Sequence, residues 1–260
     1  MTADVYELTV RGQLAAHWRE WIGARSLRHD PDGTTTITID VDDQAHLHGL
    51  LIRIRDIGAP LLAMRVVDAA NPSLAQALRT ERLILRAGVV ADAAATWAFR
   101  RLPEVAEWLT GTPGTPEEYR AFFADPDRLA DTVIIELAGS GKIIGDFMLR
   151  RSDAWTQIEL AEQAREAQVE LGWVIDPRFA RRGYATEAVR ALLRHSFEDL
   201  GVRRVTADCF LANEASWRLM ERVGMRREVH AVRDSLHRSG QWLDTVGYAV
   251  LADEWSNAVR

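Results

Sequence analysis

Apolar and polar residues alternate with two different periods in the first part of the chain. Residues 5–11 place Tyr6, Leu8 and Val10 on one side, and residues 34–41 alternate β-branched positions in the same way. This period of two predicts β-strands, and a further strand is predicted over residues 61–67. Two segments with apolar residues every three or four positions predict helices; they contain Leu14, Trp18, Trp21 and Ile22, and then Leu47, Leu50, Leu51, Ile54 and Ile57.

Turn and cap residues separate these segments. The run Asp30-Pro31-Asp32-Gly33 has strong turn chemistry, and Asp42 or Asp43 is expected to cap the second helix, which Gly58 ends. The pattern therefore predicts a small α/β sandwich at the start of the chain.

A change of composition after Asp68 marks a domain boundary. The run Ala69–Ser73 contains Asn-Pro, which interrupts regular structure. From Thr80 onward, strand-like runs at 82–86, 133–137, 142–150, 169–175 and 202–211 alternate with helical runs. We predict an α/β (α+β) chain with a small domain at residues 1–72, a linker at 73–79 and a larger domain at 80–260.

Composition excludes several classes of protein. Of the 260 residues, 47% are hydrophobic and 27% are charged, which excludes large-scale disorder. The net charge of −6 argues against sequence-independent binding of nucleic acid. No apolar run approaches the roughly 18 residues of a membrane span, and the first residues lack the features of a signal peptide. The sequence therefore predicts a cytoplasmic protein that binds neither nucleic acid nor membrane.

Cysteine and histidine residues offer no metal site. Cys209 is the single cysteine, which excludes an internal disulfide and a multi-cysteine zinc site. Its alternation with Val205 and Ala207 predicts a residue of a strand core. His46 and His48 are two positions apart, so on a helix they face different directions and do not chelate one metal. We predict no bound metal.

The glycines at 139 and 141 do not form a phosphate-binding motif. A P-loop needs a glycine five residues before Gly141 and a serine or threonine after Lys142, where this chain has Glu136 and Ile143. A hairpin turn between two strands is the simpler interpretation.

Residues 169–188 form a strand, a loop and a helix whose sequence suggests a binding site for an anion. A strand ends at Pro177, and a loop with Arg181, Arg182 and Gly183 leads into a helix. Such a loop turns successive backbone N–H groups toward one point at a helix N-terminus, which is an anion site that suits a diphosphate. A plain turn with two solvated arginines is the alternative.

The run Arg181–Ala188 resembles the acetyl-CoA pyrophosphate loop of the GNAT N-acetyltransferase superfamily, in its ribosomal-protein, RimJ/RimL-like branch. Further similar segments follow in register over residues 80–255, at Thr80–Arg86, Ile143–Asp146, Glu170–Pro177, Asn213–Ser216, Met220–Met225, Asp244–Val246 and Glu254–Trp255. The resemblance implies a GNAT-fold mixed sheet in the larger domain and does not extend to residues 1–72.

The resemblance also implies a cofactor site for acetyl-CoA. Its residues would be Arg181, Arg182, Gly183, Tyr184, Ala185 and Thr186 in the loop, the backbone of Trp173, Val174 and Ile175, where a strand irregularity holds the thioester carbonyl, and Asn213. Asn213 is equally a plain helix cap. Ala180 stands where the superfamily usually has glutamine or arginine, so one side-chain contact is absent.

Three residues are candidates for catalysis. A protonated amine does not attack, so a carboxylate base is expected. The resemblance implies Glu170 as the first candidate, because the branch often carries a glutamate five residues before the position of Ile175, and Asp208 as the second, because some relatives keep their base five residues before the position of Asn213. A salt-bridged or solvated strand residue is the alternative for each. Met220 occupies the position where many members carry a tyrosine acid. Asn213 and Ser216 match the Asn-x-x-Ser pattern of the RimJ/RimL-like branch, and this resemblance implies that the Ser216 hydroxyl assists the leaving thiolate. The alternative is a residue that serves only the first helical turn.

These expectations leave several functions open. The leading hypothesis is acetylation of a primary amine by direct attack, with a protein N-terminus as the acceptor. A small amine, such as an aminoglycoside or polyamine, and a non-catalytic regulator that binds acyl-CoA are the alternatives. Trp97, Trp108 and Trp155 either line the acceptor cleft or pack in the core. The N-terminal domain is expected to serve dimerisation, giving a homodimer, or substrate docking.

Overall fold

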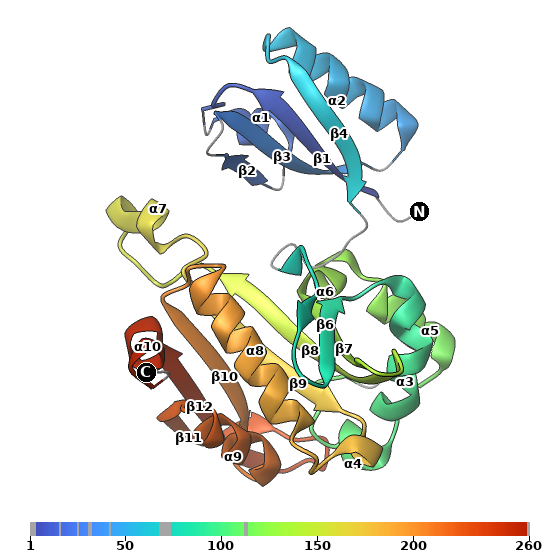
Figure 1. Ribbon diagram of the computed structural model, residues 1–260, viewed down its shortest axis with the longest axis vertical. Helices are drawn as coiled ribbons and strands as arrows, with labels where there is room; N and C mark the ends of the chain where they lie inside the picture. Colours follow the sequence, from blue (N-terminus) through green and yellow to red (C-terminus); the bar gives the residue numbers. More distant parts are fainter. Residues whose placement is uncertain are drawn as a thin grey trace. The chain divides into compact units, whose positions relative to one another are not determined.

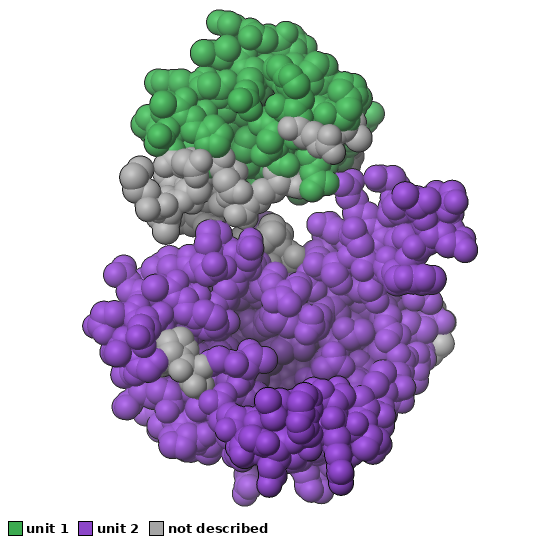
Figure 2. Space-filling view, turned by 180° about the vertical axis from the view of Figure 1, so that it is seen from behind, with its two compact units in different colours: residues 1–69 green, residues 70–260 purple. Residues whose placement is uncertain are grey.

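The computed structural model describes residues 4–15, 17–24, 26–30, 33–41, 43–67, 74–111 and 114–258. The chain divides into two compact units, residues 1–69 and residues 70–260 (Figure 2). Each unit has its own hydrophobic core. The expected linker opening at 69–73 lies outside the described residues, whereas Leu74 is buried in the core of the second unit.

The first unit is a four-stranded antiparallel sheet with two helices (Figure 1). Its strands follow the order β2-β3-β1-β4, and its elements are β1 (Asp4–Arg11), α1 (Trp18–Ile22), β2 (Ser26–His29), β3 (Thr34–Val41), α2 (Gln44–Asp56) and β4 (Leu61–Val67). The predicted alternation is confirmed, because Tyr6, Leu8 and Val10 are buried against the helices. Asp43 caps α2 by accepting a hydrogen bond from the N–H of His46.

Strand β2 was not predicted. It has four residues at the edge of the sheet, and none of them is fully buried. A short, exposed edge strand carries no apolar alternation, so its sequence gives no period to detect.

The second unit is an eight-stranded mixed sheet with helices on both faces (Figure 1). The strand order is β11-β12-β10-β9-β8-β7-β6-β5. The strands are β5 (Leu78–Arg79), β6 (Leu83–Ala87), β7 (Thr132–Leu137), β8 (Ile143–Ser152), β9 (Gln168–Ile175), β10 (Arg204–Phe210), β11 (Arg226–Leu236) and β12 (Trp242–Leu251). Neighbouring strands are antiparallel except β9 and β10, which are parallel.

The helices of this unit are α3 (Ala93–Arg100), α4 (Pro103–Ala106), α5 (Pro116–Phe123), α6 (Pro126–Asp131), α7 (Ala161–Ala164), α8 (Tyr184–Glu198), α9 (Glu214–Arg222) and α10 (Ala252–Ala258). Helix α8 buries Val189, Leu192 and Leu193 against the sheet, as the sequence predicted. In the described part of the chain, no helix is long and apolar enough to span a bilayer.

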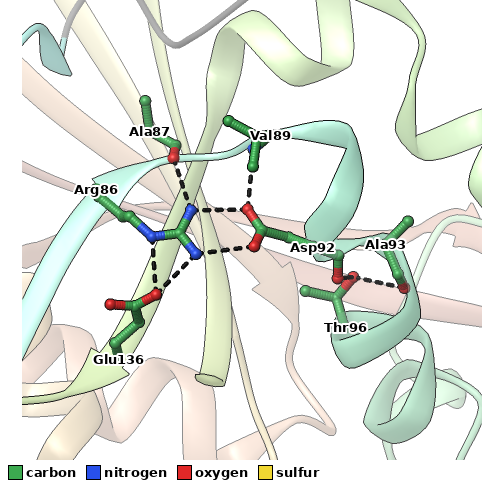
Figure 3. Close-up of polar contacts among 7 residues, drawn as sticks. All are labelled: Arg86, Ala87, Val89, Asp92, Ala93, Thr96 and Glu136. Carbon is green, nitrogen blue, oxygen red and sulfur yellow. Dashed lines mark hydrogen bonds and ion pairs between the residues drawn. The ribbon is translucent and has the colours of Figure 1, made fainter. Parts of the chain in front are cut away.

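Ion pairs attach the helices of the opposite face to the sheet. Arg86 in β6 donates hydrogen bonds to Glu136 in β7 and to both carboxylate oxygens of Asp92, which also accepts from the N–H of Val89 (Figure 3). Deeper in this layer, Arg100 of α3 donates to Asp146 of β8 at 2.8 Å. Asp146 is only 2% exposed, so this carboxylate depends on its arginine for stability.

Candidate functional site

The loop between β9 and α8 adopts the backbone of an anion cradle. Arg181 has φ 59° and Gly183 has φ 81°, so two left-handed residues flank Arg182. The N–H groups of the first helical turn have no acceptor within a helix, and α8 adds a positive dipole end. These groups, together with the exposed Arg181 and Arg182, fit a diphosphate, and Ala180 removes none of the backbone donors.

Strands β9 and β10 separate next to this loop. They are paired over three positions, from Gln168–Arg204 to Glu170–Thr206, and the described pairing does not continue toward their carboxyl ends. Strand β9 keeps an unbroken register with β8 as far as Ile175. The expected irregularity near Trp173–Ile175 is therefore not a shift within the β8–β9 ladder; it is the loss of the neighbour on the β10 side.

Glu170 and Asp208 lie on the same face of the sheet. Val169 and Leu171 pack into the core beneath α8 and α9, and so do Val205 and Ala207, so the intervening residues face the other side. The two carboxylates differ in their surroundings. Glu170 lies 3.8 Å from the guanidinium of Arg150, whereas desolvation raises the pKa of Asp208 above its usual range, and Arg204 offsets this only in part.

Ser216 lies on the opposite face, in the first turn of α9. Its Oγ accepts a hydrogen bond of 2.9 Å from the indole N–H of Trp173, whose strand is the neighbour of β10. Asn213 caps α9 by accepting a bond from the N–H of Ser216. A serine hydroxyl that accepts one hydrogen bond can still donate its own proton, so Ser216 can accept from Trp173 and donate to a ligand atom at the same time.

An aromatic cluster lies beyond Asp208 along β10. Phe210 is two residues further on the same face, and its ring contacts His237 at 5.3 Å and Trp108 at 6.4 Å between centroids. The Nδ1 of His237 accepts from the N–H of Ser239, so its Nε2–H donates to the carbonyl of Glu107, at 2.9 Å. This cluster joins the segment after α4 to the turn between β11 and β12. Trp155, by contrast, is 94% exposed and packs in no core.

Cys209 has no features of a nucleophile. It packs against the core beneath α9, as predicted, and burial together with the nearby charge of Asp208 raises the pKa of its thiol to about 11. At neutral pH the thiol is therefore protonated. Among the described residues, no group of three or more histidine, cysteine, aspartate or glutamate side chains is arranged to hold a metal ion.

A mixed sheet that opens beside a helix N-terminus suited to an anion is the arrangement of a CoA-dependent acyltransferase. The family model described as "Acetyltransferase (GNAT) domain" matches residues 82–226, and the chain belongs to this family. Residues 5–65 match a model described as a domain of unknown function, DUF8691. The resemblance noted in the sequence is confirmed, and the chain has a separate N-terminal domain.

Individual relatives agree with this assignment. The chain is 36% identical over 91 residues to "Uncharacterized N-acetyltransferase YnaD" of Bacillus subtilis, covering 35% of this chain and 53% of that protein. It is 36% identical over 88 residues to "Putative ribosomal N-acetyltransferase YdaF" of the same organism, covering 34% of this chain and 48% of that protein. The chain thus spans about half the length of these curated relatives.

A solved structure extends the similarity to most of the second unit. The acetyltransferase of the GNAT family from Bacillus anthracis has a TM-score of 0.59 and 27% identity, and the match covers 68% of this chain and 99% of that one. The mixed-sheet fold of this domain is therefore established.

Sequence reasoning did not single out two features of the site. Arg82 and Glu187 join the cradle loop to the start of β6, although 105 positions separate them. Trp173 was expected to contribute its backbone, and its side chain also binds Ser216. Both contacts join elements that are distant in sequence, so no local pattern indicates them.

Proposed function

We propose that this protein is an acetyl-CoA-dependent N-acetyltransferase that acetylates a primary amine by direct attack in a ternary complex. Acetyl-CoA supplies an acetyl thioester, which a neutral amine attacks without an enzyme nucleophile. The observation that carries the proposal is the separation of β9 from β10 next to the cradle, with carboxylates on one face and Ser216 on the other.

The chain's own residues have distinct tasks in this proposal. The loop residues from Arg181 to Thr186 bind the diphosphate, and the unpaired edge of β9 over Trp173–Ile175 directs backbone N–H groups to the thioester oxygen. Ser216 donates its hydroxyl proton toward the sulfur as the thiolate leaves. Asn213 holds the turn that carries this serine.

Asp208 is the base in this proposal, and Glu170 takes second place. A carboxylate is a better general base when its pKa is closer to the pH at which the enzyme works. Desolvation shifts the pKa of Asp208 in that direction. Glu170 shares the guanidinium of Arg150, which also binds Asp131 at 2.6 Å. The raised pKa supports Asp208 over the order that the sequence suggested.

The acceptor is proposed to be the N-terminal amine of a protein. The relative named as a putative ribosomal N-acetyltransferase supports this class of acceptor. The aromatic cluster of Trp108, Phe210 and His237 adjoins Asp208 and offers apolar surface for a first side chain. Cytoplasmic location, homodimer formation and a docking role for residues 1–72 remain predictions.

The experiment compares acceptors at fixed acetyl-CoA. Peptides with free N-termini, the same peptides with a formyl-blocked N-terminus, spermidine and an aminoglycoside are assayed for thiol release, and products are weighed by mass spectrometry. The proposal expects one added acetyl group on free peptides and none on the blocked ones. Acetylation of the small amines alone would reject the protein acceptor, and binding of acetyl-CoA with no product from any amine would indicate a non-catalytic regulator.

A further inference from the structure

The cradle loop is held by a clamp from the turn between β5 and β6. The clamp consists of Thr80, Arg82 and Glu187. Glu187, in the first turn of α8, uses both carboxylate oxygens: Oε1 accepts from the hydroxyl of Thr80 at 2.6 Å and from the backbone N–H of Arg82 at 2.9 Å. Oε2 accepts from Nε of Arg82 at 2.7 Å and lies 2.6 Å from its Nη2.

The Glu187 carboxylate is charged within the clamp. Burial by itself would raise the pKa of Glu187, but hydrogen bonds from Thr80 and Arg82 outweigh it and hold that pKa below its usual value. The carboxylate is therefore ionised at neutral pH. Charged hydrogen bonds of this kind are shorter and stronger than neutral ones. The Arg82 guanidinium also lies 4.6 Å from the ring centroid of Tyr184, the first residue of α8.

One further contact reaches the loop itself. The Nη1 of Arg82 donates to the carbonyl oxygen of Arg182 at 3.0 Å. A peptide group is planar, so the carbonyl of Arg182 and the N–H of Gly183 point in opposite directions. Fixing the carbonyl toward Arg82 therefore fixes the N–H of Gly183 on the side away from it. Gly183 tolerates φ of either sign, so its own backbone does not restrict this peptide to one orientation.

We propose that Arg82 is a positioning residue for acetyl-CoA, which orients the Gly183 N–H and the first turn of α8 toward the diphosphate without touching it. The inference rests on the proposed function, because it assigns a task within the same cofactor site. It requires the forked guanidinium: a lysine keeps the charge and one contact with Glu187, but it cannot also reach the carbonyl of Arg182.

Calorimetry with acetyl-CoA on the full chain tests the proposal. Arg82→Lys and Arg82→Gln are expected to bind about 10- to 100-fold more weakly, as for the loss of hydrogen bonds to charged groups. Arg79→Gln removes the same charge from an exposed position in the adjacent β5 and is expected to bind like the wild type. Thermal unfolding of each variant establishes that it is folded. If Arg82→Gln does not fold, the comparison is made with Arg82→Lys alone.

A spectroscopic measurement separates positioning from general stability. With ¹⁵N-labelled glycine, the amide resonance of Gly183 should shift when CoA is added to the wild type and shift far less in folded Arg82→Lys. Wild-type affinity in Arg82→Lys, or an unchanged Gly183 response, would overturn the proposal while leaving the proposed function intact. Failure of the wild type itself to bind acetyl-CoA would reject both.

Discussion

Gly247 in β12 is paired with Asp208 in β10. A side chain added at position 247 would therefore displace the Asp208 carboxylate while the aspartate itself stays unchanged. A Cβ at position 247 would lie 2.6 Å from Oδ1 of Asp208 and 3.2 Å from Cβ of Val229. Ordinary contact begins at 3.4 Å, so in Gly247→Ala the carboxylate must move by about 0.8 Å. The Asp208 carboxylate is the end of a flexible side chain and can turn aside, so we expect the free energy of unfolding to fall by only about 1 kcal/mol.

The effect on activity should be much larger. Misplacing a reacting group by 1 Å can cost on the order of 10²-fold, so we expect kcat/KM in Gly247→Ala to fall by about 30- to 100-fold. Asp208→Asn should lose on the order of 10²- to 10⁴-fold, as for removal of a general base. In wild type the rate should decline on the acid side as Asp208 gains a proton, at a higher pH than for an ordinary aspartate, because desolvation raises its pKa. The pH–rate profile of Asp208→Asn should lack this decline at acid pH.

The assay is thiol release from acetyl-CoA with a free N-terminal peptide, measured for both single variants and the double variant. If displacement of the carboxylate is the cause, Gly247→Ala should change the rate of Asp208→Asn by less than about threefold, because coupled sites are not additive. Gly49→Ala, where the new methyl meets nothing within 4 Å, controls for the substitution itself. Equal losses from Gly247→Ala in both backgrounds would refute the assignment of Asp208 as the base.

Three further outcomes follow from the structure. Asp146→Asn leaves Arg100 buried without its partner and should lower the free energy of unfolding by about 3–5 kcal/mol in urea titrations; a loss below about 1 kcal/mol would contradict this. Ser216→Ala and Trp173→Phe should each lower kcat by about tenfold or less with unchanged affinity for acetyl-CoA, and an increase in Kd alone would argue for a binding role instead. Iodoacetamide at pH 8 should leave Cys209 of the native protein unmodified, since its thiol pKa is about 11, and rapid labelling would show that the side chain is accessible and ionised.

The sequence predicted the elements whose residues follow a clear period. Strand β1 and helix α2 were found from alternation and from an apolar stripe, and Gly183 was found because the loop needs a left-handed residue there. The loop is local, so its residues stand together in the sequence. The family resemblance supplied what periodicity could not, namely that the larger domain is a GNAT-fold mixed sheet.

Contacts between distant segments were not predictable in this way. The bond from Trp173 to Ser216 spans 43 positions, and the one from His237 to Glu107 spans 130. Their formation depends on strand order and on which face each side chain occupies. The sequence also did not show which of the two carboxylates is the better general base. Only folding brings Arg150 close to Glu170 and desolvates Asp208.

Calorimetry of acetyl-CoA binding to the wild type, Gly183→Asp and Gly201→Asp tests the central claim most directly. Gly183 is the N-cap of α8 and Gly201 follows its C-terminal end, and both have positive φ, so each substitution places the same charged side chain at a left-handed position. The account predicts that the wild type and Gly201→Asp bind acetyl-CoA with micromolar affinity and that Gly183→Asp does not. Equal binding by both variants, or no binding by the wild type, would contradict it.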